Sequence, residues 1–314
     1  MTLPILLIEA HSRCNCRCEM CDIWKNTDSQ SFTPAELSAQ LDSIDRLGTR
    51  WVVFTGGEPL LNPDLFALAV PLRDRGIQVS ILSTGLLFER FATQIAEHLD
   101  TAVVSIDGPP QLHDAIRHTP GGFERIVRGI GAIRTSRPGF PITARCVVQQ
   151  RNHDSLTATA SAAEAIGIDS ISFLAADLTS HAFHRGEPWP ILRQNQIALT
   201  TEQLPELDRQ LAELSQNPFV ADSPNHLLRI GHHFRAHLGM ALPKSPHCNA
   251  PWISAFLRSD GSVQPCFFHP SFASAPRESL YTILHSPNAE AFRDALDIEN
   301  NPTCQRCVCS LYAA

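Results

Sequence analysis

The sequence predicts an α/β fold, a partial (βα)6 TIM-like barrel followed by a small C-terminal β-hairpin/helix domain. Three observations predict it. Residues 1–175 alternate strand-like and helix-like patterns six times. The strand-like runs are continuously apolar, as in parallel strands that are buried on both faces. One cysteine-rich segment lies at the start of this alternating region, and a second lies near the C-terminus, beyond it. A doubly wound sheet is the alternative arrangement of the same units.

The expected strands are the apolar runs at residues 5–8, 51–54, 79–82, 102–106, 142–148 and 170–174. The first helix begins at the capping box Thr33-Pro34-Ala35-Glu36, with proline at the first helical position, and ends at Gly48. A second helix opens at Asn62-Pro63 and ends at Gly76, and further helices are expected over 88–99, 122–135 and 154–166. Ligands collect at the carboxyl ends of parallel strands, so functional residues are expected at that edge.

The regular alternation ends after residue 175. Residues 176–195 follow the sixth strand and contain two prolines, so a lid or binding loop is expected there. Helices are expected over about 202–216 and 225–239. His233 and His237 lie one helical turn apart and could form a metal pair, but an apolar stripe on the same helix favours histidines at the edge of the core. The expected domains are a barrel at 1–220, a helical linker at 221–246 and a C-terminal domain at 247–314.

The composition argues against several classes of protein. The net charge is −7, and nucleic-acid binding needs a basic stripe. No apolar run approaches the ~18 residues that a membrane-spanning helix requires, and the apolar start of the chain is too short and wrongly flanked for a signal peptide. Ten cysteines without a secretion signal indicate metal ligation rather than disulfides. The sequence therefore predicts a cytoplasmic metalloprotein with neither a nucleic-acid nor a membrane partner.

Cys14, Cys18 and Cys21 form a C-x3-C-x2-C pattern directly after the first strand. Three thiolates on one short loop can hold three irons of a [4Fe–4S] cube and leave the fourth iron open to a small chelating molecule. Zinc is the competing metal, but structural zinc sites use four ligands. The fourth local cysteine is Cys16, whose side chain is expected to point away from its neighbours.

A second motif, Thr55-Gly56-Gly57-Glu58-Pro59, follows the second strand. Paired glycines expose backbone groups to a ligand without obstruction by a β carbon, and Glu58 offers a negative acceptor for an ammonium group. Alone, this motif could be a tight turn. Together with the cysteine pattern it resembles the radical S-adenosylmethionine (SAM) superfamily, with Met20 as a departure from the aromatic residue that is usual there. The resemblance implies that Cys14, Cys18 and Cys21 hold the SAM-cleaving cluster and that Gly56, Gly57, Glu58 and Pro59 hold the amino group of SAM.

Polar residues also follow the third and fourth strands, in Ser83-Thr84-Gly85 and Ser105-Ile106-Asp107-Gly108. The second tetrapeptide resembles its counterpart in SPASM and Twitch enzymes of the superfamily. By that resemblance Ser83, Ser105 and Asp107 are candidates to bind the SAM ribose. Arg145 on the fifth strand could pair with the SAM carboxylate, and Arg117 could serve instead. The alternative for each is an ordinary structural role, such as satisfying backbone groups where a loop begins.

Four cysteines near the C-terminus form a second group. Cys248 and Cys266 stand in the pattern C-x12-G-x4-C, and Cys304 and Cys307 in C-x2-C. Ser259-Asp260-Gly261 lies between apolar segments at 253–257 and 262–268 and predicts a hairpin that brings the first pair together. A helix over about 280–296 would return the chain so that the second pair completes a four-thiolate site. By spacing alone, a zinc ribbon competes with a cluster here.

This tail resembles the SPASM and Twitch auxiliary domains, which hold additional [4Fe–4S] clusters. A full SPASM domain continues with more cysteines, whereas only Cys309 follows Cys307 in this chain. The resemblance therefore implies a Twitch-like domain with one auxiliary [4Fe–4S] cluster, ligated by Cys248, Cys266, Cys304 and Cys307. Cys309 is the alternative to Cys307.

The resemblance implies a radical SAM oxidoreductase. An electron from a donor such as flavodoxin or ferredoxin would enable SAM cleavage to methionine and a 5′-deoxyadenosyl radical, which abstracts a substrate hydrogen. The auxiliary cluster would then accept the second electron. The expected substrate is a small molecule, a sugar or aminocyclitol-like alcohol.

Three other functions compete with this one. A peptide-modifying enzyme that forms crosslinks or thioethers is disfavoured because the cluster loop begins by residue 14, which leaves no room for a fused N-terminal recognition domain. A redox-neutral epimerase would need a thiol hydrogen donor among Cys16, Cys146 and Cys309. A cluster- or zinc-stabilised binding protein would leave the glycine motif at 56–59 unexplained.

Overall fold

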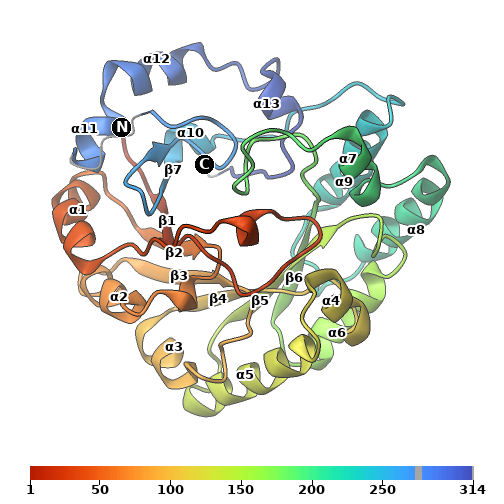
Figure 1. Cartoon of the computed structure of the whole chain (residues 1–314), viewed down its shortest axis with the longest axis horizontal. Helices are drawn as coiled ribbons and strands as arrows, with labels where there is room; N and C mark the ends of the chain where they lie inside the picture. Colours follow the sequence, from red (N-terminus) through yellow and green to blue (C-terminus); the bar gives the residue numbers. More distant parts are fainter. Residues whose placement is uncertain (273–277, 313–314) are drawn as a thin grey trace.

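The computed structural model describes residues 1–272 and 278–312. Its main sheet has eight strands in the order β6-β5-β4-β3-β2-β1-β7-β8. Neighbours from β1 to β6 all pair in parallel, which confirms the α/β class and the six expected strands. These strands are β1 (Ile5–His11), β2 (Trp51–Gly56), β3 (Gln78–Ser83), β4 (Thr101–Ser105), β5 (Ile142–Val148) and β6 (Ser170–Ala175). The sheet curves into a partial barrel with helices on its outer side (Figure 1).

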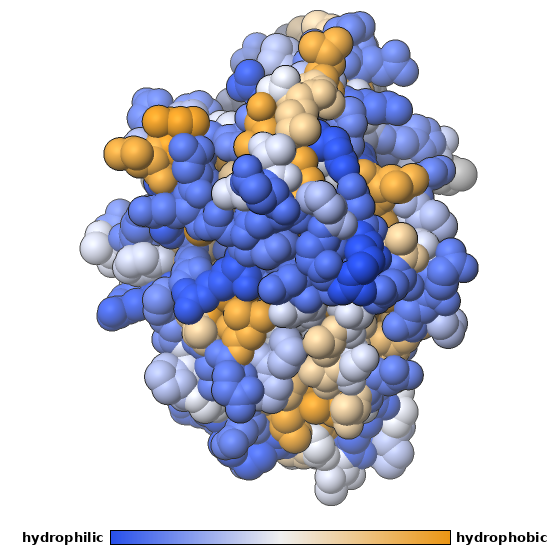
Figure 2. Space-filling model, turned by 90° about the vertical axis from the view of Figure 1, so that its right-hand side faces the viewer, coloured by the Kyte–Doolittle hydropathy of each residue, from blue (hydrophilic) through white to orange (hydrophobic). Residues whose placement is uncertain are grey.

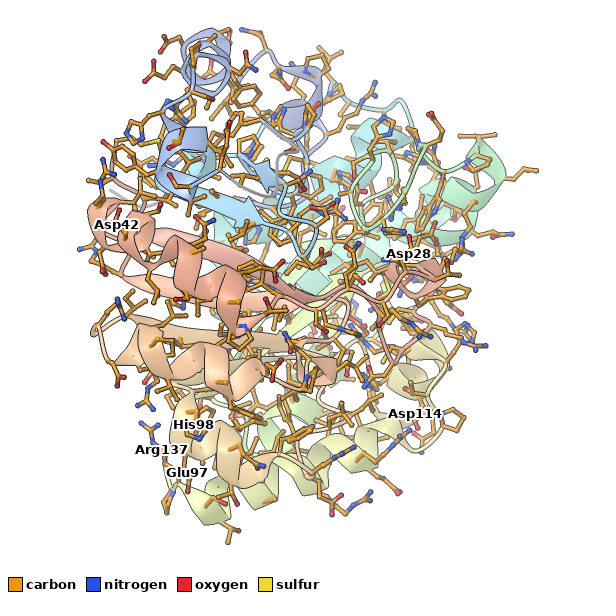
Figure 3. All side chains as sticks on the ribbon, turned by 60° about the vertical axis from the view of Figure 1, so that its left-hand side comes forward. Asp28, Asp42, Glu97, His98, Asp114 and Arg137 are labelled. Atoms are coloured by element: carbon orange, nitrogen blue, oxygen red, sulfur yellow. The ribbon has the colours of Figure 1, made fainter. Side chains whose placement is uncertain are left out.

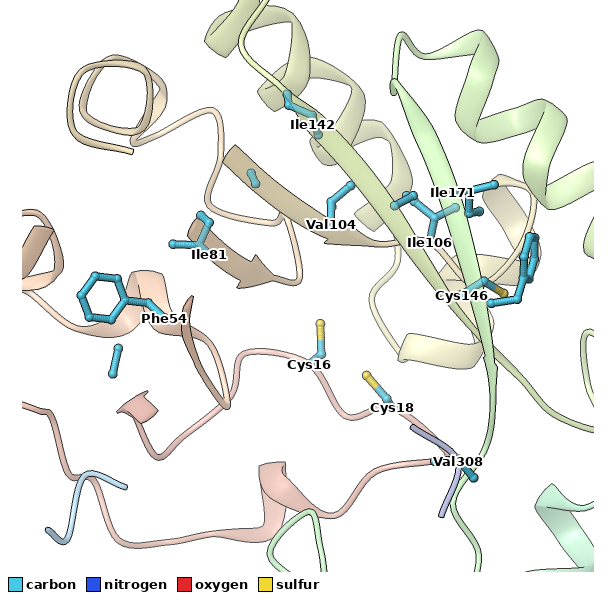
Figure 4. Packing of buried hydrophobic residues seen from close by; sticks show 14 of the residues in the cluster. Cys16, Cys18, Phe54, Ile81, Val104, Ile106, Ile142, Cys146, Ile171 and Val308 are labelled. Carbon is cyan, nitrogen blue, oxygen red and sulfur yellow. The ribbon is translucent and has the colours of Figure 1, made fainter. Parts of the chain in front are cut away.

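The outer face of the sheet forms the core with the covering helices. Side chains such as Phe54, Ile81 and Val104 are fully buried there (Figure 4). Alternate residues on β4 and β6 are half-buried, as the two-residue period of a strand requires. The concave side of the barrel is therefore the open side, where a ligand can enter.

Nine helices accompany the six strands up to residue 237. They are α1 (Pro34–Arg46), α2 (Leu65–Arg73), α3 (Ala92–His98), α4 (Pro110–Arg117), α5 (Gly122–Ser136), α6 (Leu156–Ala165), α7 (Ile191–Ile197), α8 (Leu204–Leu214) and α9 (Pro224–His237). The capping box at Thr33 and Glu36 is present. α2 begins three residues later than expected, at Leu65. The Asn62 side chain accepts from the Asp64 amide at 2.8 Å and donates to the carbonyls of Ala10 and Phe32, both at 2.8 Å, so it binds the turn before the helix to β1 and its following loop.

Figure 3 separates the two ends of the barrel. Glu97, His98 and Arg137 lie together at one end, where Arg137 donates to the carbonyls of Ala96 and Leu99. Asp28 and Asp114, which follow β1 and β4, lie at the other end. Asp114 accepts hydrogen bonds from the amides of Gly121 and Phe123 at 2.6 and 2.8 Å and so fixes the turn between α4 and α5. This second end carries the carboxyl termini of the strands.

The C-terminal segment continues the barrel sheet. β7 (Ser254–Leu257) pairs in parallel with β1 and antiparallel with β8 (Val263–Gln264). The carboxylate of Glu9 accepts hydrogen bonds from the Ser259 amide and hydroxyl, at 3.1 and 2.8 Å, which fixes the hairpin turn against β1. The hairpin was predicted, but its second strand is much shorter than the expected 262–268.

Short helices make up the rest of this segment, namely α10 (Ala250–Ile253), α11 (Leu280–Leu284), α12 (Pro287–Ala295) and α13 (Pro302–Gln305). The single helix expected over 280–296 is wrong. The helix is interrupted after Leu284. A new helix, α12, begins at Pro287, and the hydroxyl of Ser286 caps its first turn. In the part of the chain that the structure describes, no helix is long and apolar enough to cross a membrane.

Candidate active site and auxiliary cluster site

The loop of Cys14, Cys18 and Cys21 crosses the carboxyl end of the barrel. The amides of Arg17 and Glu19 donate to the carbonyls of Arg117 and Ile116, at 3.3 and 3.0 Å. The last turn of α4 therefore holds the middle of the cysteine loop. Figure 4 shows Cys16 and Cys18 on this loop, with the buried side chains of the strands behind it. α4 was not among the helices predicted from the sequence, so this support of the cysteine loop was not foreseen.

Cys16 does not point away from its neighbours, and that expectation is wrong. Its side chain is buried, its thiol hydrogen-bonds with those of Cys14 and Cys18, and its amide donates to the Cys14 sulfur at 3.5 Å. The hydrogen bond to Cys14, and further burial, raise the pKa of the Cys16 thiol to about 12. The Cys16 thiol therefore lies next to those of Cys14 and Cys18.

A buried cation lies beside these thiols. Arg117 donates to the Asp107 carboxylate at 2.7 Å, and its charge acts to lower the pKa of Cys16, Cys18 and Cys21. Burial is the main reason that the Cys21 pKa is nevertheless raised, to about 12. Metal binding requires deprotonated thiols, and a neighbouring guanidinium favours the thiolate form.

The glycine pair lets two backbone segments touch. A β carbon on Gly56, which has φ of +124°, would lie 2.3 Å from the His11 carbonyl oxygen, and one on Gly57 would lie 2.1 Å from that of Arg13. The amides of Gly57 and Glu58 donate to the same two carbonyls, both at 2.9 Å. The end of β2 is thereby bound to the chain that enters the cysteine loop.

The carboxylate of Glu58 is fully buried and bound by protein donors. It accepts hydrogen bonds from the Leu60 amide at 3.1 Å, the Ser83 hydroxyl at 2.9 Å, and the Thr84 hydroxyl and amide at 2.7 and 2.8 Å. Burial raises the pKa of Glu58, and the donors oppose that rise. Pro59 follows at the start of a short 3-10 turn (Pro59–Leu61). Glu58 and Ser83 thus join the ends of β2 and β3 to each other.

The remaining candidates for SAM contact divide into two groups. Asp107 is fully buried and accepts from Arg117 and from the Val147 amide at 2.8 Å, so both it and Arg117 bind protein groups. Ser105 is half-buried at the end of β4, in register with Arg145 on β5. Arg145 is exposed on the concave face, with its Nε 3.3 Å from the Ser172 hydroxyl. Ser105 and Arg145 are the two of these that remain accessible to a ligand.

Residues 176–195, expected to form a lid, pack onto the cysteine loop as a strap. Arg185 forms a buried ion pair with Asp177 and donates to the Met20 carbonyl at 3.3 Å. Its guanidinium stacks on the Trp189 ring at 3.7 Å, and the Trp189 indole donates to Asp22 at 2.6 Å. The strap thereby fixes both sides of Cys21.

The C-terminal cysteines gather around one cavity of about 240 Å³. Its opposite wall is the concave face of the barrel, including Leu7, Val53, Leu82, Val103 and Arg145. Its cysteine wall consists of Cys248, Cys266, Cys304, Cys307 and Cys309. Burial raises the pKa of Cys266 to about 12, and Cys248 and Cys304 raise it further, which reflects how close these thiols lie.

The thiols of this group line one cavity but are not arranged around a single point. Within residues 1–272 and 278–312, no three His, Cys, Asp or Glu side chains are close enough to share one metal ion. In an iron–sulfur cube the irons are bound by separate thiolates, so the ligands can be spaced more widely than around zinc. Arg229 donates to the carbonyls of Cys307 and Val308, at 2.7 and 2.8 Å, and so fixes the last cysteines.

Sequence profiles match both parts of the chain. Residues 8–160 match the radical SAM superfamily, and residues 248–308 match the SPASM iron–sulfur cluster-binding domain. The two matches cover the cysteine loop, the glycine motif and the C-terminal cysteines. The chain belongs to the radical SAM superfamily.

Several known proteins resemble this radical SAM chain, most of them over nearly its whole length. An AdoMet-dependent heme synthase of Methanosarcina barkeri is 27% identical over 93% of this chain and 84% of the relative. A heme synthase of Nitratidesulfovibrio vulgaris is 30% identical over a shorter stretch, 45% of this chain and 40% of the relative. The PqqA peptide cyclase of Ruegeria pomeroyi is 26% identical over 98% of this chain and 81% of the relative. The solved structure of anSMEcpe with bound AdoMet has a TM-score of 0.64 at 19% identity, covering 92% of this chain and 82% of that one.

The two domains imply SAM and two [4Fe–4S] clusters as cofactors. The residues present fit both clusters, since one loop presents three thiols beside a buried guanidinium and one cavity gathers five more. All five face the same cavity, so both Cys307 and Cys309 remain candidates for the fourth auxiliary ligand.

Replacing Gly57 with alanine is expected to weaken SAM binding and to destabilise the radical SAM domain by roughly 1–3 kcal/mol. The new β carbon would press on the Arg13 carbonyl and displace the backbone that leads into Cys14. Urea unfolding and equilibrium SAM binding measure the two effects. Gly131→Ala is the control, because nothing lies within 4 Å of a β carbon there. Unchanged SAM binding in Gly57→Ala would contradict the proposed role of this contact.

Replacing Arg185 with methionine is expected to destabilise the protein by about 3–5 kcal/mol, because Asp177 would be left charged and buried. The side chains of the pair are only 1% and 2% exposed. Iron bound by the cysteine loop should fall in the same variant, since the strap no longer holds the Met20 carbonyl. Arg209→Met removes exposed ion pairs and should change the free energy of unfolding by less than ~1 kcal/mol. Equal effects of the two changes would show that the strap does not support the cluster loop.

Proposed function

We propose that this radical SAM enzyme removes two electrons from a small-molecule substrate and passes the second electron to the auxiliary cluster. The observation that carries the proposal is the shared cavity, which has the concave face of β1–β5 on one side and the C-terminal cysteines on the other. A substrate bound in this cavity would lie against the C-terminal cysteines, and we infer that it extends from there toward the cysteine loop at the carboxyl ends of the strands. On this proposal the second electron passes from the substrate to the auxiliary cluster without a further carrier.

The chemistry of hydrogen abstraction belongs to the cofactors, because SAM bound at the first cluster supplies a 5′-deoxyadenosyl radical. The protein chain holds these cofactors and shields them from solvent. Cys14, Cys18 and Cys21 are proposed to ligate the first cluster, and Ser105 and Arg145 to contact SAM from the concave face. Gly56, Gly57, Glu58 and Pro59 are proposed to shape the edge that receives its amino group. At the second site, Cys248, Cys266, Cys304 and Cys307 would saturate the cluster, which favours electron transfer over direct binding of substrate.

Two substrate classes have support. The sequence predicts a sugar or aminocyclitol-like alcohol, for which Arg145 supplies a polar group in the cavity wall, whereas the Ser80 hydroxyl is buried and bonded to Trp51 and Thr101. The same wall is otherwise largely apolar, with Ile5, Leu7, Val53, Leu82 and Val103 facing the space, and a polyhydroxylated molecule would find few hydrogen-bond partners there. The apolar lining and the similarity to heme synthases favour a second class, a porphyrin whose carboxylate pairs with a wall cation.

The alternatives receive unequal support. Similarity to the PqqA peptide cyclase supports a peptide substrate. The epimerase loses one candidate donor, because Cys146 faces the helices, is fully buried and lies 3.6 Å from the Asn152 amide. Cys16 belongs to the cluster loop, so Cys309 is the remaining thiol that lines the cavity.

Deuterium transfer tests this proposal. The reconstituted enzyme is given SAM, reduced flavodoxin and one deuterated candidate at a time: an aminocyclitol, a sugar alcohol, a porphyrin carboxylate or a peptide. We expect deuterium in 5′-deoxyadenosine, with one oxidised product per deoxyadenosine, for one of the small molecules. A shift of the porphyrin absorption band on mixing would identify the second class. Transfer from the peptide alone, or deuterium exchange without net oxidation, would contradict the proposal.

A further inference from the structure

A second cavity, of about 250 Å³, lies on another side of the C-terminal cysteines. Its walls come from the second half of α9, the start of the strap, residues 243–244 and the end of α13. Cys307 lines both this cavity and the one that faces the barrel. α9 belongs to the face shown in Figure 2, which is mostly hydrophilic with scattered apolar spots.

The charged groups around this cavity are all basic. Arg229, Lys244 and Arg306 line it together with His232, His233 and His237, and no Asp or Glu is among its lining residues. This is unusual for a chain with 32 acidic and 25 basic residues. Burial, with the neighbouring Arg229 charge, lowers the pKa of His233 to about 4, so that ring is neutral at ordinary pH. The fixed positive charge therefore comes from the two arginines and the lysine.

These three cations have no acidic partner in the described ranges 1–272 and 278–312. The terminal nitrogens of Arg229 donate hydrogen bonds to the carbonyls of Cys307 and Val308. Neither Lys244 nor Arg306 forms an ion pair. On the same helix, outside the cavity, Arg235 does pair with Asp208. Arg229 lies beside Cys307, where the thiolates of the auxiliary cluster supply negative charge. Lys244 and Arg306 are the cations left without a counter-charge, and an anion bound between them removes their mutual repulsion.

We propose that this cavity binds a small, multiply charged oxyanion of the phosphate or polycarboxylate class. Guanidinium groups bind both kinds of oxyanion through paired hydrogen bonds, and a lysine adds a compact charge. Leu178, Ala236 and Pro243 also line the cavity and can pack against the carbon part of an organic ligand. The bound anion would lie beside Cys307, between the auxiliary site and the protein surface.

Calorimetric titration of the reconstituted two-cluster protein, kept anaerobic at fixed ionic strength, tests this site. Pyrophosphate and citrate serve as the probes, and the tighter of the two identifies phosphate or polycarboxylate as the ligand class. We expect one anion per chain, and a loss of affinity of about tenfold or more in the Lys244→Gln/Arg306→Gln variant. Arg235→Gln is the matched control and should bind as wild type does. Iron content confirms that each variant is folded.

Three results would overturn the proposal. The first is no detectable binding of either probe to the wild-type protein. The second is wild-type affinity in the Lys244→Gln/Arg306→Gln variant. The third is an equal loss in Arg235→Gln, which would mean that the probes respond to overall charge and not to this cavity.

Discussion

Replacing Cys14, Cys18 and Cys21 together with alanine is expected to abolish SAM cleavage and to leave about four irons per chain, those of the auxiliary cluster. The three thiols lie on one loop that α4 and the strap hold at the barrel edge, beside the Arg117–Asp107 pair. SAM can be cleaved only at a cluster in which the protein leaves one iron without a ligand. The three cysteines of this loop would leave one iron open, whereas the C-terminal cysteines supply four ligands to the other cluster. Deoxyadenosine formation under reducing conditions, with an iron assay, measures both effects.

Cys16→Ala is the matched control for that variant. Its thiol lies among the same cysteines, but the superfamily spacing skips its position, so we expect both clusters and full SAM cleavage to be retained. Loss of the first cluster in this single variant would refute the ligand assignment. Persistent SAM cleavage in the triple variant would place the active cluster elsewhere in the chain.

Replacing Cys304 and Cys307 with alanine is expected to remove the auxiliary cluster while SAM cleavage continues. Oxidised product should fall by orders of magnitude, because the substrate radical has lost its electron acceptor. Deoxyadenosine would then accumulate without matching product. The single changes Cys307→Ala and Cys309→Ala distinguish the two candidate ligands. The variant that loses a true ligand should lose the auxiliary cluster, whereas the variant that loses the other cysteine should keep about eight irons.

Stability must be measured in the same samples, because removing a metal centre from a small segment can unfold it. β7 belongs to the barrel sheet, so retained SAM cleavage shows that the fold survives. Undiminished product would mean that the auxiliary cluster is structural. A substrate-dependent shift of the auxiliary electron paramagnetic resonance signal in the wild-type enzyme would indicate an open iron and only three cysteine ligands.

Local sequence patterns predicted the parts of this fold that depend on local physics. Apolar runs of strand length marked all six barrel strands, and the Thr33 capping box marked the start of α1. The two cysteine groups were predicted to form separate sites, and the structure brings the C-terminal group to one cavity. Periodicity and capping chemistry act over a few residues, so they can be recognised without knowing the tertiary fold.

Long-range pairing was not visible in the sequence. Nothing in the pattern around residue 254 indicates that β7 extends the sheet beside β1, because parallel pairing depends on the whole barrel. The polar candidates at strand ends were equally ambiguous. Ser83 and Asp107 bind Glu58 and Arg117, whereas Ser105 and Arg145 face the open side. A serine or aspartate after a strand looks the same in both cases, and only its tertiary partners distinguish them.

Iron, sulfide and zinc content of the anaerobically reconstituted wild-type protein tests the central claim most directly. Two [4Fe–4S] clusters predict about eight irons and about eight sulfides per chain, with zinc far below one equivalent. The same sample should show two distinct cluster signals after reduction, one of which changes when SAM is added. About four irons per chain, or one or more equivalents of tightly bound zinc, would contradict the two-cluster enzyme proposed for this chain.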